Sequence, residues 1–511
     1  MGNWLRRISH RPWRWGLVTL GLVVLLGLWP RANPALEPQM IRLWSRSDGA
    51  PIAYYAVGDE FLTAAFQLLD DYWIDLRDHS PNLLRGHLDH YLPPELQALH
   101  YEPADDLMAD FADRFFAARH PQTGLIPYAY DVPIPGDPHN PAEAHLTSDH
   151  KQPVGLIARA VEFCRWFPQD QTLQQNCVDL AHRTMAYFDV PADPQPNGLW
   201  GWVDVGDTQA RSSLTLTQDY GDVALAMAQI SQWTGDSTYA QWADEKVRFV
   251  WQQRMTPDLP LLQEQFVLDR ALERPDEPSS DTDTLYFVRQ LFDLAERTGQ
   301  TTYRDWALAV TDLWVEQAWN ESWGHFVRKL SPDGTPAVDT LYGDGKYNTL
   351  AILEQAYVAT GKTAYLERLR RAWKNLAAMG QGGLAPEAIQ RGQGNPAEEL
   401  DAQQTFFLEI LVDTYNASGD PRFLADAEAL GHAILQRGES VMRLESGQAG
   451  QAFLKLALAR QPVERVSLSL AQPNTPIPIT QAGKTVGQLV PPTEEVVIYL
   501  AGDGYGLGDH L

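Results

Sequence analysis

Acidic residues recur at the start of successive apolar helical segments, a spacing that suits acid–base chemistry. The pairs Asp219/Asp222 and Asp281/Asp283 place two carboxyl groups on neighbouring positions or one helical turn apart, each beside a tyrosine. Cleavage of a glycosidic bond uses two carboxyl groups, one that protonates the leaving oxygen and one that activates water. We therefore take Asp219, Asp222, Asp281 and Asp283 as candidate catalytic residues.

A structural role explains each of these acids equally well. Aspartate is a preferred helix N-cap, and acids in the first helical turn complement the helix dipole. The same pattern includes further acids at segment starts: Asp149, Asp344, Glu398, Glu399, Asp401 and Glu445. N-capping of single helices and a shared acidic funnel both remain open.

Aromatic and basic residues near these acids are candidates for substrate binding. Aromatic faces stack on sugar rings, and packing in the core is the alternative for each of them. His150 is either an acid–base residue beside Asp149 or a lone loop histidine, and Lys346 in GDGKY could bind an acidic sugar. The candidate substrate-binding residues are Trp200, Trp202, Tyr220, Tyr286, Tyr347, His150, Lys346 and Glu399.

Common metal, nucleotide and nucleophile motifs are missing from the sequence. It contains no HExxH, CxxC, GxSxG or P-loop pattern, and the glycine-rich GDGYGLG at 502–508 lacks a strand–helix context. We expect no metal and no cofactor.

The elements that position these residues are helical hairpins, as residues 281–330 illustrate. An almost wholly apolar segment from Leu285 to Ala295 predicts a buried helix, and Gly299 then suits a helix C′ position. From Tyr303 to Trp314 apolar residues recur at i, i+3, i+4 and i+7, which predicts a second helix with one buried stripe.

This hairpin recurs along the chain at intervals of about 60 residues. Its turn is written TGDSTY, TGQTTY, TGKTAY and SGDPRF, with Gly235, Gly299, Gly361 and Gly419 in equivalent places. Inner helices are predicted to begin near 152, 218, 283, 347, 402 and 447, and outer helices near 104, 171, 237, 302, 363 and 421. Short strands are predicted at 124–131, 198–204, 324–330 and 382–388.

These hairpins resemble those of the six-hairpin glycosidase superfamily. GGLAPEA and the hairpin ending SGDPRF are also similar to segments of class I α-mannosidases. The resemblance covers about residues 100–460 and implies an all-α fold, an (α/α)6 toroid with short strands in the rim loops. NPAEELD stands where class I α-mannosidases carry an Arg-Pro-Glu motif, so no catalytic residue is carried over. An open solenoid is the alternative, and the apolar character of the inner helices favours the closed ring.

Outside the toroid at 101–460 the sequence predicts three further segments. Residues 1–35 have four arginines before an uncharged run from Trp15 to Pro30, which is typical of a signal peptide or a signal anchor. Residues 36–100 are predicted as a linker, with one short extended piece ending near 58, and a leading helix. Residues 461–511 are predicted as a small β appendage.

Export is therefore expected, to the periplasmic or extracellular side, with residues 15–30 cleaved or kept as a membrane anchor. Export permits a disulfide between Cys164 and Cys177 on consecutive helices, and two buried thiols are the alternative.

Charge and resemblance together define the expected function. The chain of 511 residues has 40 basic and 66 acidic residues, and a net charge of −26 argues against nucleic acid as a partner. The resemblance implies an exported carbohydrate-active enzyme acting on an oligo- or polysaccharide, with a glycoside hydrolase as the leading interpretation. The alternatives are a sugar epimerase or a polysaccharide lyase on the same fold, and a non-catalytic toroid that binds polysaccharide or protein in envelope or exopolysaccharide assembly.

Overall fold

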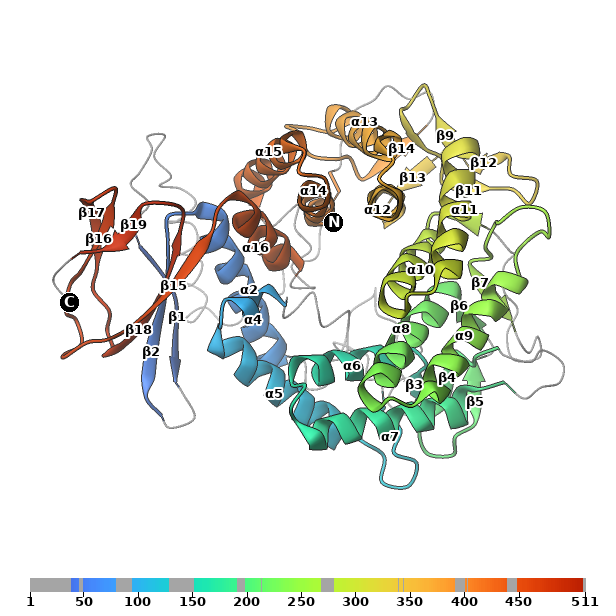
Figure 1. Ribbon diagram of the computed structural model, residues 1–511, viewed down its shortest axis with the longest axis horizontal. Coiled ribbons are helices and arrows are strands. Elements are labelled where there is room, and N and C mark those ends of the chain that lie inside the picture. The colour runs from blue at the N-terminus through green and yellow to red at the C-terminus, as the bar shows by residue number, and fades with distance from the viewer. Residues whose placement is uncertain are drawn as a thin grey trace, which may run out of the picture. The chain divides into compact units, whose positions relative to one another are not determined.

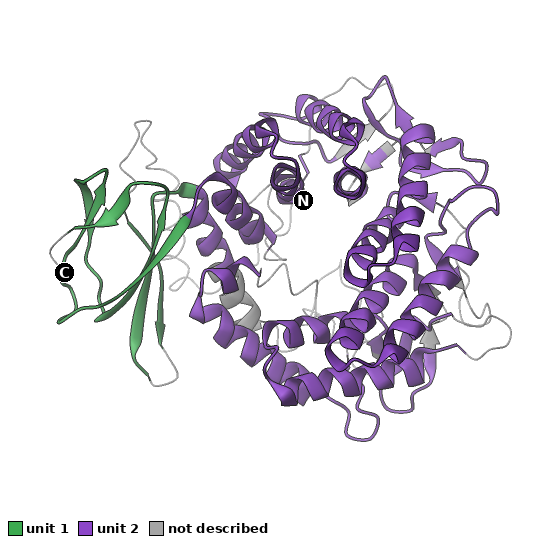
Figure 2. Ribbon diagram, in the orientation of Figure 1, with its two compact units in different colours: residues 1–60, 463–511 green, residues 61–462 purple. Residues whose placement is uncertain are grey.

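The chain divides into two compact units, which are described separately (Figure 2). Residues 61–462 form one unit, and residues 1–60 with 463–511 form the other. The computed structural model describes residues 38–45, 49–79, 94–127, 151–190, 198–212, 214–267, 280–338, 340–342, 344–390, 400–401, 403–438 and 448–508.

The larger unit is a ring of helical hairpins, with inner helices around its centre and outer helices packed behind them (Figure 1). The inner helices are α6 (Leu156–Trp166), α8 (Thr217–Thr234), α10 (Thr284–Thr298), α12 (Asp344–Thr360), α14 (Gln404–Ser418) and α16 (Gln448–Arg460). The outer helices are α5 (Glu102–Ala117), α7 (Gln171–Phe188), α9 (Ser237–Gln252), α11 (Thr301–Gln317), α13 (Thr363–Met379) and α15 (Pro421–Arg437). The predicted (α/α)6 toroid is confirmed, and the helix starts agree with prediction to within a few residues.

Glycine ends the inner helices as predicted. Gly235, Gly299 and Gly419 adopt positive φ values of 71°, 70° and 67°, and Gly361 adopts 69°. A left-handed residue lets the backbone turn sharply toward the outer helix, and only glycine adopts it without steric cost.

The ring closes through helices that precede the first hairpin. Phe61 of α2 (Glu60–His79) lies 5.8 Å from Phe453 of α16, and Phe66 lies 4.9 Å from Tyr101 beside α5. Between them, α4 (Glu95–Ala98) donates a hydrogen bond of 3.0 Å from Gln97 Nε2 to the Trp166 carbonyl at the end of α6. The closed ring is therefore correct, and the open solenoid is not observed.

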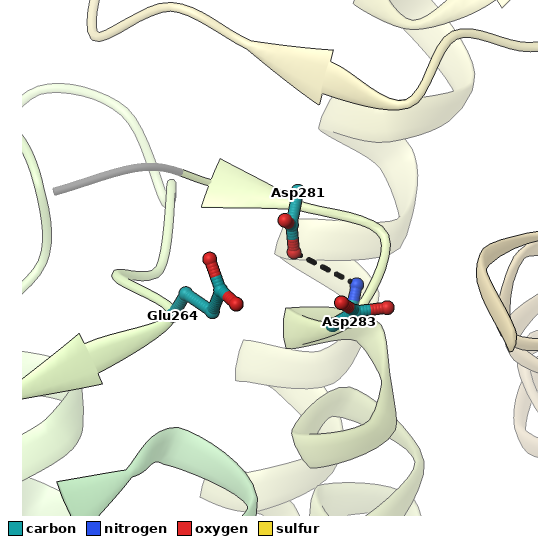
Figure 3. Close-up of side chains that lie close together, drawn as sticks. All are labelled: Glu264, Asp281 and Asp283. Carbon is teal, nitrogen blue, oxygen red and sulfur yellow. Dashed lines mark hydrogen bonds between the residues drawn. The ribbon is translucent and has the colours of Figure 1, made fainter. Parts of the chain in front are cut away.

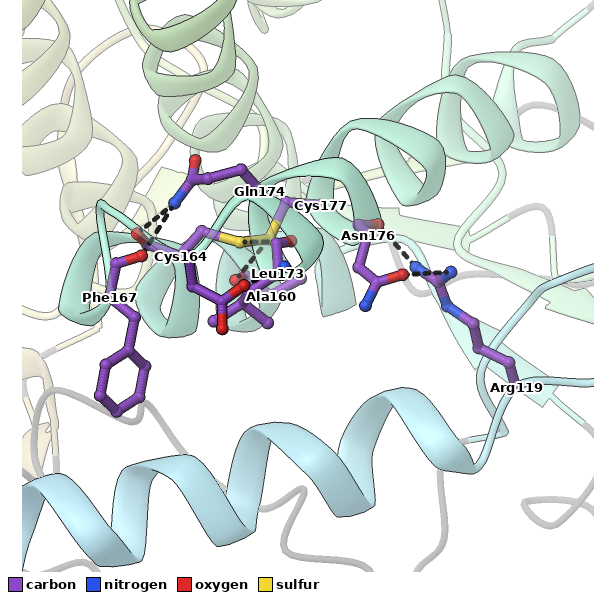
Figure 4. Close-up of a disulfide and its surroundings, with 9 residues drawn as sticks. Arg119, Ala160, Cys164, Phe167, Leu173, Gln174, Asn176 and Cys177 are labelled. Carbon is purple, nitrogen blue, oxygen red and sulfur yellow. Dashed lines mark hydrogen bonds between the residues drawn. A yellow bond between two sulfur atoms is a disulfide. The ribbon is translucent and has the colours of Figure 1, made fainter.

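A disulfide joins the first inner helix to its outer partner (Figure 4). Cys164 of α6 and Cys177 of α7 are bonded, with their Cα atoms 6.8 Å apart. Gln174 Nε2 of α7 donates to the Cys164 carbonyl at 2.6 Å. Arg119, which follows α5, donates from Nη2 to the carbonyl of Asn176 on α7 at 2.6 Å. The turn between these helices, FPQDQTL, has no glycine, and its Asp170 caps α7 by accepting the Leu173 N–H at 2.9 Å.

Short strands connect the loops at the end of the ring where inner helices begin. The pairs are β3 (Lys151–Pro153) with β4 (Trp202–Asp204) and β5 (Ala210–Ser212), β6 (Leu214–Leu216) with β7 (Gln265–Val267), β8 (Ser280–Asp281) with β11 (Lys329–Leu330) and β12 (Pro336–Val338), β9 (Trp319–Asn320) with β10 (His325–Phe326), and β13 (Thr340–Tyr342) with β14 (Ala388–Gln390). Strands occur within 198–204 and 324–330 as predicted, whereas only the last residue of 382–388 begins a strand. Residues 124–127 form no strand, and the rest of that predicted strand lies outside the described residues.

The smaller unit combines strands from both ends of the chain. A four-stranded sheet has the order β1 (Gln39–Ser45), β2 (Pro51–Val57), β18 (Glu495–Ala501), β15 (Val463–Ser469), with β2 and β18 parallel. A second sheet contains β17 (Lys484–Leu489), β16 (Ile477–Gln481) and β19 (Tyr505–Leu507), and Ile477, Ile479 and Ile498 help to fill the core of the unit. Residues 39–57, assigned from sequence mainly to a linker, thus belong to the same unit as the predicted C-terminal β appendage.

Among the described residues, no helix has both the length and the apolar character needed to cross a membrane. The predicted signal or anchor at 1–35 lies outside the described part of the chain.

Candidate functional site

The inner helices α10, α12 and α14 carry partly exposed, mostly polar positions at helical spacing, against the expectation that inner helices are apolar throughout. On α10 the partly exposed positions include Asp283 at its N-cap, Tyr286, Arg289 and Asp293, whereas most positions between them are buried. Tyr347 and Glu354 on α12, and Phe406 and Asp413 on α14, repeat this spacing. The expectation was wrong because one polar residue per helical turn is easily overlooked in an otherwise apolar run.

These stripes face the centre of the ring. Glu409 of α14 raises the pKa of Arg289 on α10 although α12 lies between the two helices, and Lys455 of α16 affects the pKa of Glu354 on α12 across α14. The inner helices surround one centre (Figure 1), so side chains of inner helices that are not neighbours come near one another on the side that faces this centre. We call Arg289, Asp293, Glu354, Glu409, Asp413 and Lys455 the central polar cluster.

Lys455 ties two of the cluster's acids together. Its Nζ lies 2.6 Å from Glu409 Oε1 and 3.1 Å from Asp413 Oδ2, and Gln448 Nε2 donates to Glu409 Oε2 at 3.1 Å. Burial alone would lower the pKa of Lys455, but the two carboxylates outweigh it and raise the pKa. The ion pair with this lysine favours the charged form of Glu409.

Glu354 is a carboxyl group of a different kind. No described residue forms a hydrogen bond or an ion pair with it. Burial raises the pKa of Glu354 to about 7, and the nearby Asp413 adds to the rise. Burial similarly raises the pKa of Asp413 to about 6, against the opposing charge of Lys455. The cluster thus combines a carboxyl group that titrates near neutral pH, Glu354, with one that is paired to a lysine, Glu409, and acid–base catalysis uses two carboxyl groups in such different environments.

The sequence contained a signal for this cluster that we did not recognise. An aromatic residue in the first turn of an inner helix is followed two turns later by an acid in Tyr286/Asp293, Tyr347/Glu354 and Phe406/Asp413. Tyr286 and Tyr347 were predicted as substrate-binding residues, whereas Phe406 and the three acids were not, because the acids lie two turns beyond the helix starts.

The first predicted acid pair is engaged with its own and a neighbouring helix. Asp219 Oδ2 accepts a hydrogen bond of 3.1 Å from the Leu216 N–H at the start of α8, and burial raises the pKa of Asp219 to about 6. Asp222 Oδ1 accepts a hydrogen bond of 2.6 Å from Gln290 Nε2 of α10. Asp219 therefore has the capping role that was the structural alternative, and Asp222 links two inner helices.

The second pair joins an acid that the sequence did not reveal (Figure 3). Glu264, Asp281 and Asp283 bring their carboxylate oxygens within 4.8 Å of one another, and the Asp283 N–H donates to Asp281 Oδ1 at 2.9 Å. Three carboxylates are the hard oxygen ligands that a calcium ion takes. Lys329 Nζ, 3.5 Å from Asp281 Oδ2, supplies positive charge to this group, so the geometry alone does not require a cation.

Two predicted substrate-binding residues have structural roles. Tyr220 is 0% exposed, its hydroxyl accepts the Leu199 N–H at 3.0 Å, and its ring packs against Phe249 and Phe266 at 5.6 and 5.5 Å. Lys346 is also 0% exposed, 2.7 Å from Asp401 Oδ2, and donates to the carbonyls of Pro386 and Glu387. Neither side chain is available to a sugar, so both predictions are wrong. The motifs did not show that these side chains are buried and form hydrogen bonds within the protein.

The other predicted residues divide into three groups. Tyr286 and Tyr347 lie beside Arg289, at 5.5 and 4.6 Å from ring centroid to guanidinium carbon. Trp200 and Trp202 are partly exposed in and next to β4. His150 and Glu399 lie outside the described residues.

Comparison with known proteins identifies the fold. No protein-family model matches the sequence, and no curated protein is similar to it. An α-1,2-mannosidase from Trichoderma reesei has a similar structure, with a TM-score of 0.55 and 12% identity, over 78% of this chain and 93% of that one. A cellobiose 2-epimerase from Spirochaeta thermophila has a TM-score of 0.51 and 13% identity, over 72% and 99%. A D-mannose isomerase has a TM-score of 0.51 and 10% identity, over 70% and 98%. The resemblance to the six-hairpin glycosidases is thus confirmed at the level of the fold.

Proposed function

We propose that this six-hairpin toroid is a carbohydrate-active enzyme that hydrolyses glycosidic bonds in an oligo- or polysaccharide at the central polar cluster. The observation that carries the proposal is Glu354, a carboxyl group with a pKa of about 7 in the same cluster as Glu409, which pairs with Lys455. A glycoside hydrolase needs one protonated and one ionised carboxyl group, and with this pKa Glu354 can still donate a proton at neutral pH.

In this proposal Glu354 is the general acid. It donates its proton to the glycosidic oxygen as the bond from that oxygen to the anomeric carbon breaks, and the leaving sugar departs as an alcohol. Glu409, kept ionised by Lys455, is the second carboxylate and accepts a proton from the attacking water. Asp293 and Glu409 add negative charge near the positive charge that develops on the sugar ring.

The acids at the helix starts form a second candidate centre for the same reaction. Asp219, Asp222, Asp281 and Asp283 stay predicted catalytic residues, with Glu264 as an added member. Asp219 has the strongest case because burial raises its pKa to about 6. The competing role for Asp219 and Asp222 is structural, because Asp219 accepts the Leu216 N–H at the start of α8 and Asp222 accepts a hydrogen bond from Gln290 of α10.

The decisive experiment compares Glu354→Gln with Asp219→Asn and Asp283→Asn in the full chain. Products from α- and β-linked gluco- and manno-oligosaccharides are followed by chromatography. Glu354→Gln should lower kcat by at least about 100-fold, as loss of a general acid does. The exposed outer-helix variant Glu367→Gln is the matched control and should leave kcat unchanged.

Four results would contradict the assignment. Full activity in Glu354→Gln with loss in Asp219→Asn would move the centre to the helix starts. Sugar isomers without hydrolysis would indicate an epimerase, and unsaturated products a lyase. Binding without turnover by the wild-type chain would indicate a non-catalytic toroid.

We also propose that the chain is exported. The arginine-rich start before an uncharged run supports it, as does the Cys164–Cys177 disulfide, because such bonds persist mainly in oxidising compartments.

A further inference from the structure

Arg289 is a guanidinium in the ring centre without a hydrogen bond to any described residue. Its Nε is buried and has no hydrogen-bond partner, and no contact of that kind exists for its Nη atoms in the described part of the chain. Buried polar groups are normally paired, because an unpaired donor loses the hydrogen bonds it made to water. The donors of Arg289 therefore call for an acceptor from outside the protein.

Two tyrosines fix the orientation of this guanidinium. Its central carbon lies 4.6 Å from the centroid of the Tyr347 ring, over the ring face, and 5.5 Å from that of Tyr286. A guanidinium that stacks on an aromatic face keeps its N–H groups in the plane of the stack, where they form a rigid fork. Tyr347 is itself fixed against Phe406 at 4.8 Å.

The acids near Arg289 keep it charged but are bound to other groups. Glu409 is paired with Lys455 and Gln448, and Asp293 accepts a hydrogen bond of 3.1 Å from Gln355. Burial would lower the pKa of Arg289, whereas the neighbouring tyrosines, Asp293 and Glu409 together raise it. The result is a permanently charged and oriented fork of donors.

We propose that Arg289 is a substrate-binding residue whose guanidinium donates paired N–H bonds to adjacent hydroxyl oxygens of a neutral sugar, with Tyr347 and Tyr286 flanking it. The inference rests on the proposed carbohydrate function and adds the substrate class to it. Vicinal hydroxyls offer two acceptors side by side, which match the fork.

The charges around Arg289 favour a neutral sugar over a uronic acid. In the central polar cluster the three acids Asp293, Glu409 and Asp413 outnumber the two cations Arg289 and Lys455, and Glu354 adds to this excess only where it is ionised. A sugar carboxylate would meet this excess of acids at close range, and like charges disfavour one another. Lys346, which sequence analysis offered for an acidic sugar, is buried and engaged with Asp401.

The test measures binding to the full chain by isothermal titration calorimetry. The probes are neutral gluco- and manno-oligosaccharides, with oligogalacturonate and oligomannuronate as acidic counterparts. Arg289→Met should weaken binding of the neutral probe about 10- to 100-fold, as loss of charge-assisted hydrogen bonds does. Arg289→Lys keeps the charge without the fork and should recover only a minor part of the affinity. Arg304→Met, at an exposed arginine of an outer helix, is the matched control and should bind like wild type.

The outcomes separate this inference from the proposed function. Unchanged affinity in Arg289→Met, no binding of any neutral probe by wild type, or tighter binding of the uronates would each overturn the inference, even if the enzyme hydrolyses a glycan. Binding that depends on Arg289 without any turnover would overturn hydrolysis and leave the inference standing. Thermal unfolding of each variant shows whether weaker binding reflects loss of the folded ring.

Discussion

At the scale of single residues, burial separates groups that resemble one another in the sequence. Lys346 and Lys455 are both lysines of inner helices that pair with aspartate or glutamate. Lys346 is buried against Asp401 and two carbonyls, whereas Lys455 is partly exposed and pairs with Glu409 and Asp413 of the central polar cluster. The first stabilises the rim loops, and the second sets the charge of candidate catalytic groups.

Removal of Lys346 should destabilise the ring strongly. Lys346→Met takes away the cation that offsets the Asp401 carboxylate, and both side chains are at most 2% exposed. Breaking one partner of such a buried pair costs about 3–5 kcal/mol in the free energy of unfolding. Urea unfolding should show this loss, whereas Arg304→Met, which breaks an exposed pair with Asp305, should cost less than about 1 kcal/mol. Equal effects of the two substitutions would contradict a structural role for Lys346.

Glu354 should make stability depend on pH in a direction opposite to that of an ordinary salt-bridged acid. Its pKa is about 7 in the folded chain against a usual value of 4.5, so the folded state binds more protons between these pH values. The stability it contributes is intact below about 4.5 and is lost as pH rises to about 7, by at most about 3 kcal/mol.

Glu354→Gln removes this proton exchange. The variant should therefore gain stability relative to wild type at pH 8 and show little gain at pH 4.5. Urea unfolding at both pH values measures the two differences, and a difference that does not change with pH would show that the pKa of Glu354 is not raised.

At the scale of elements, the inner wall depends on close contact between α8 and α10. A Cβ placed on Gly221 of α8 would lie 1.9 Å from Gln290 Oε1 and 2.3 Å from its Cδ. Gln290 in turn donates to Asp222 and to the Gln218 carbonyl, so it cannot move without losing both bonds. The glycine therefore allows the amide bridge between the two helices.

Gly221→Ala should destabilise the chain although alanine favours helix. We expect a loss of about 1–3 kcal/mol from overpacking, measured by urea or thermal unfolding. Gly235→Ala is the control, because a Cβ at that position meets open space. Its positive φ alone should lower the free energy of unfolding by only about 1 kcal/mol. A stabilised Gly221→Ala would mean that the helices separate freely at this point.

The hairpins were predictable from sequence because their signals are local. Apolar periodicity and the glycine at each turn act within one helix and its cap, and they gave nearly all helix starts. The strands at 39–57 could not be assigned to their unit, because their parallel partner β18 is at the far end of the chain. Asp281 and Asp283 were predicted from their place at a helix start, whereas Glu264 is distant from them in sequence and lies beside them only in the folded chain. Tyr220 and Lys346 were misassigned because a sequence motif does not show that a side chain is buried.

At the scale of the whole molecule, the disulfide connects the proposed export to an observable state. If the chain reaches an oxidising compartment, Cys164 and Cys177 should resist thiol-alkylating reagents in the denatured protein until a reductant is added. Mass spectrometry of protein purified from the cell envelope or the medium measures this directly. The same chain retained in a reducing compartment, by deletion of residues 1–35, supplies the control and should be alkylated at both cysteines. Two reactive thiols in the exported protein would contradict the disulfide.

The parallel pairing of β2 with β18 also sets the order in which the molecule can be completed during biosynthesis. Residues Ile52–Val57 pair with Glu495–Leu500, about 440 residues later, and translation at roughly 5–20 residues per second separates them by about 20–90 s. Throughout that interval the nascent chain holds an apolar strand with one unsatisfied edge, a feature prone to intermolecular pairing. The whole toroid is synthesised before that strand can meet its partner, so this sheet cannot be completed until the last residues of the chain have been made.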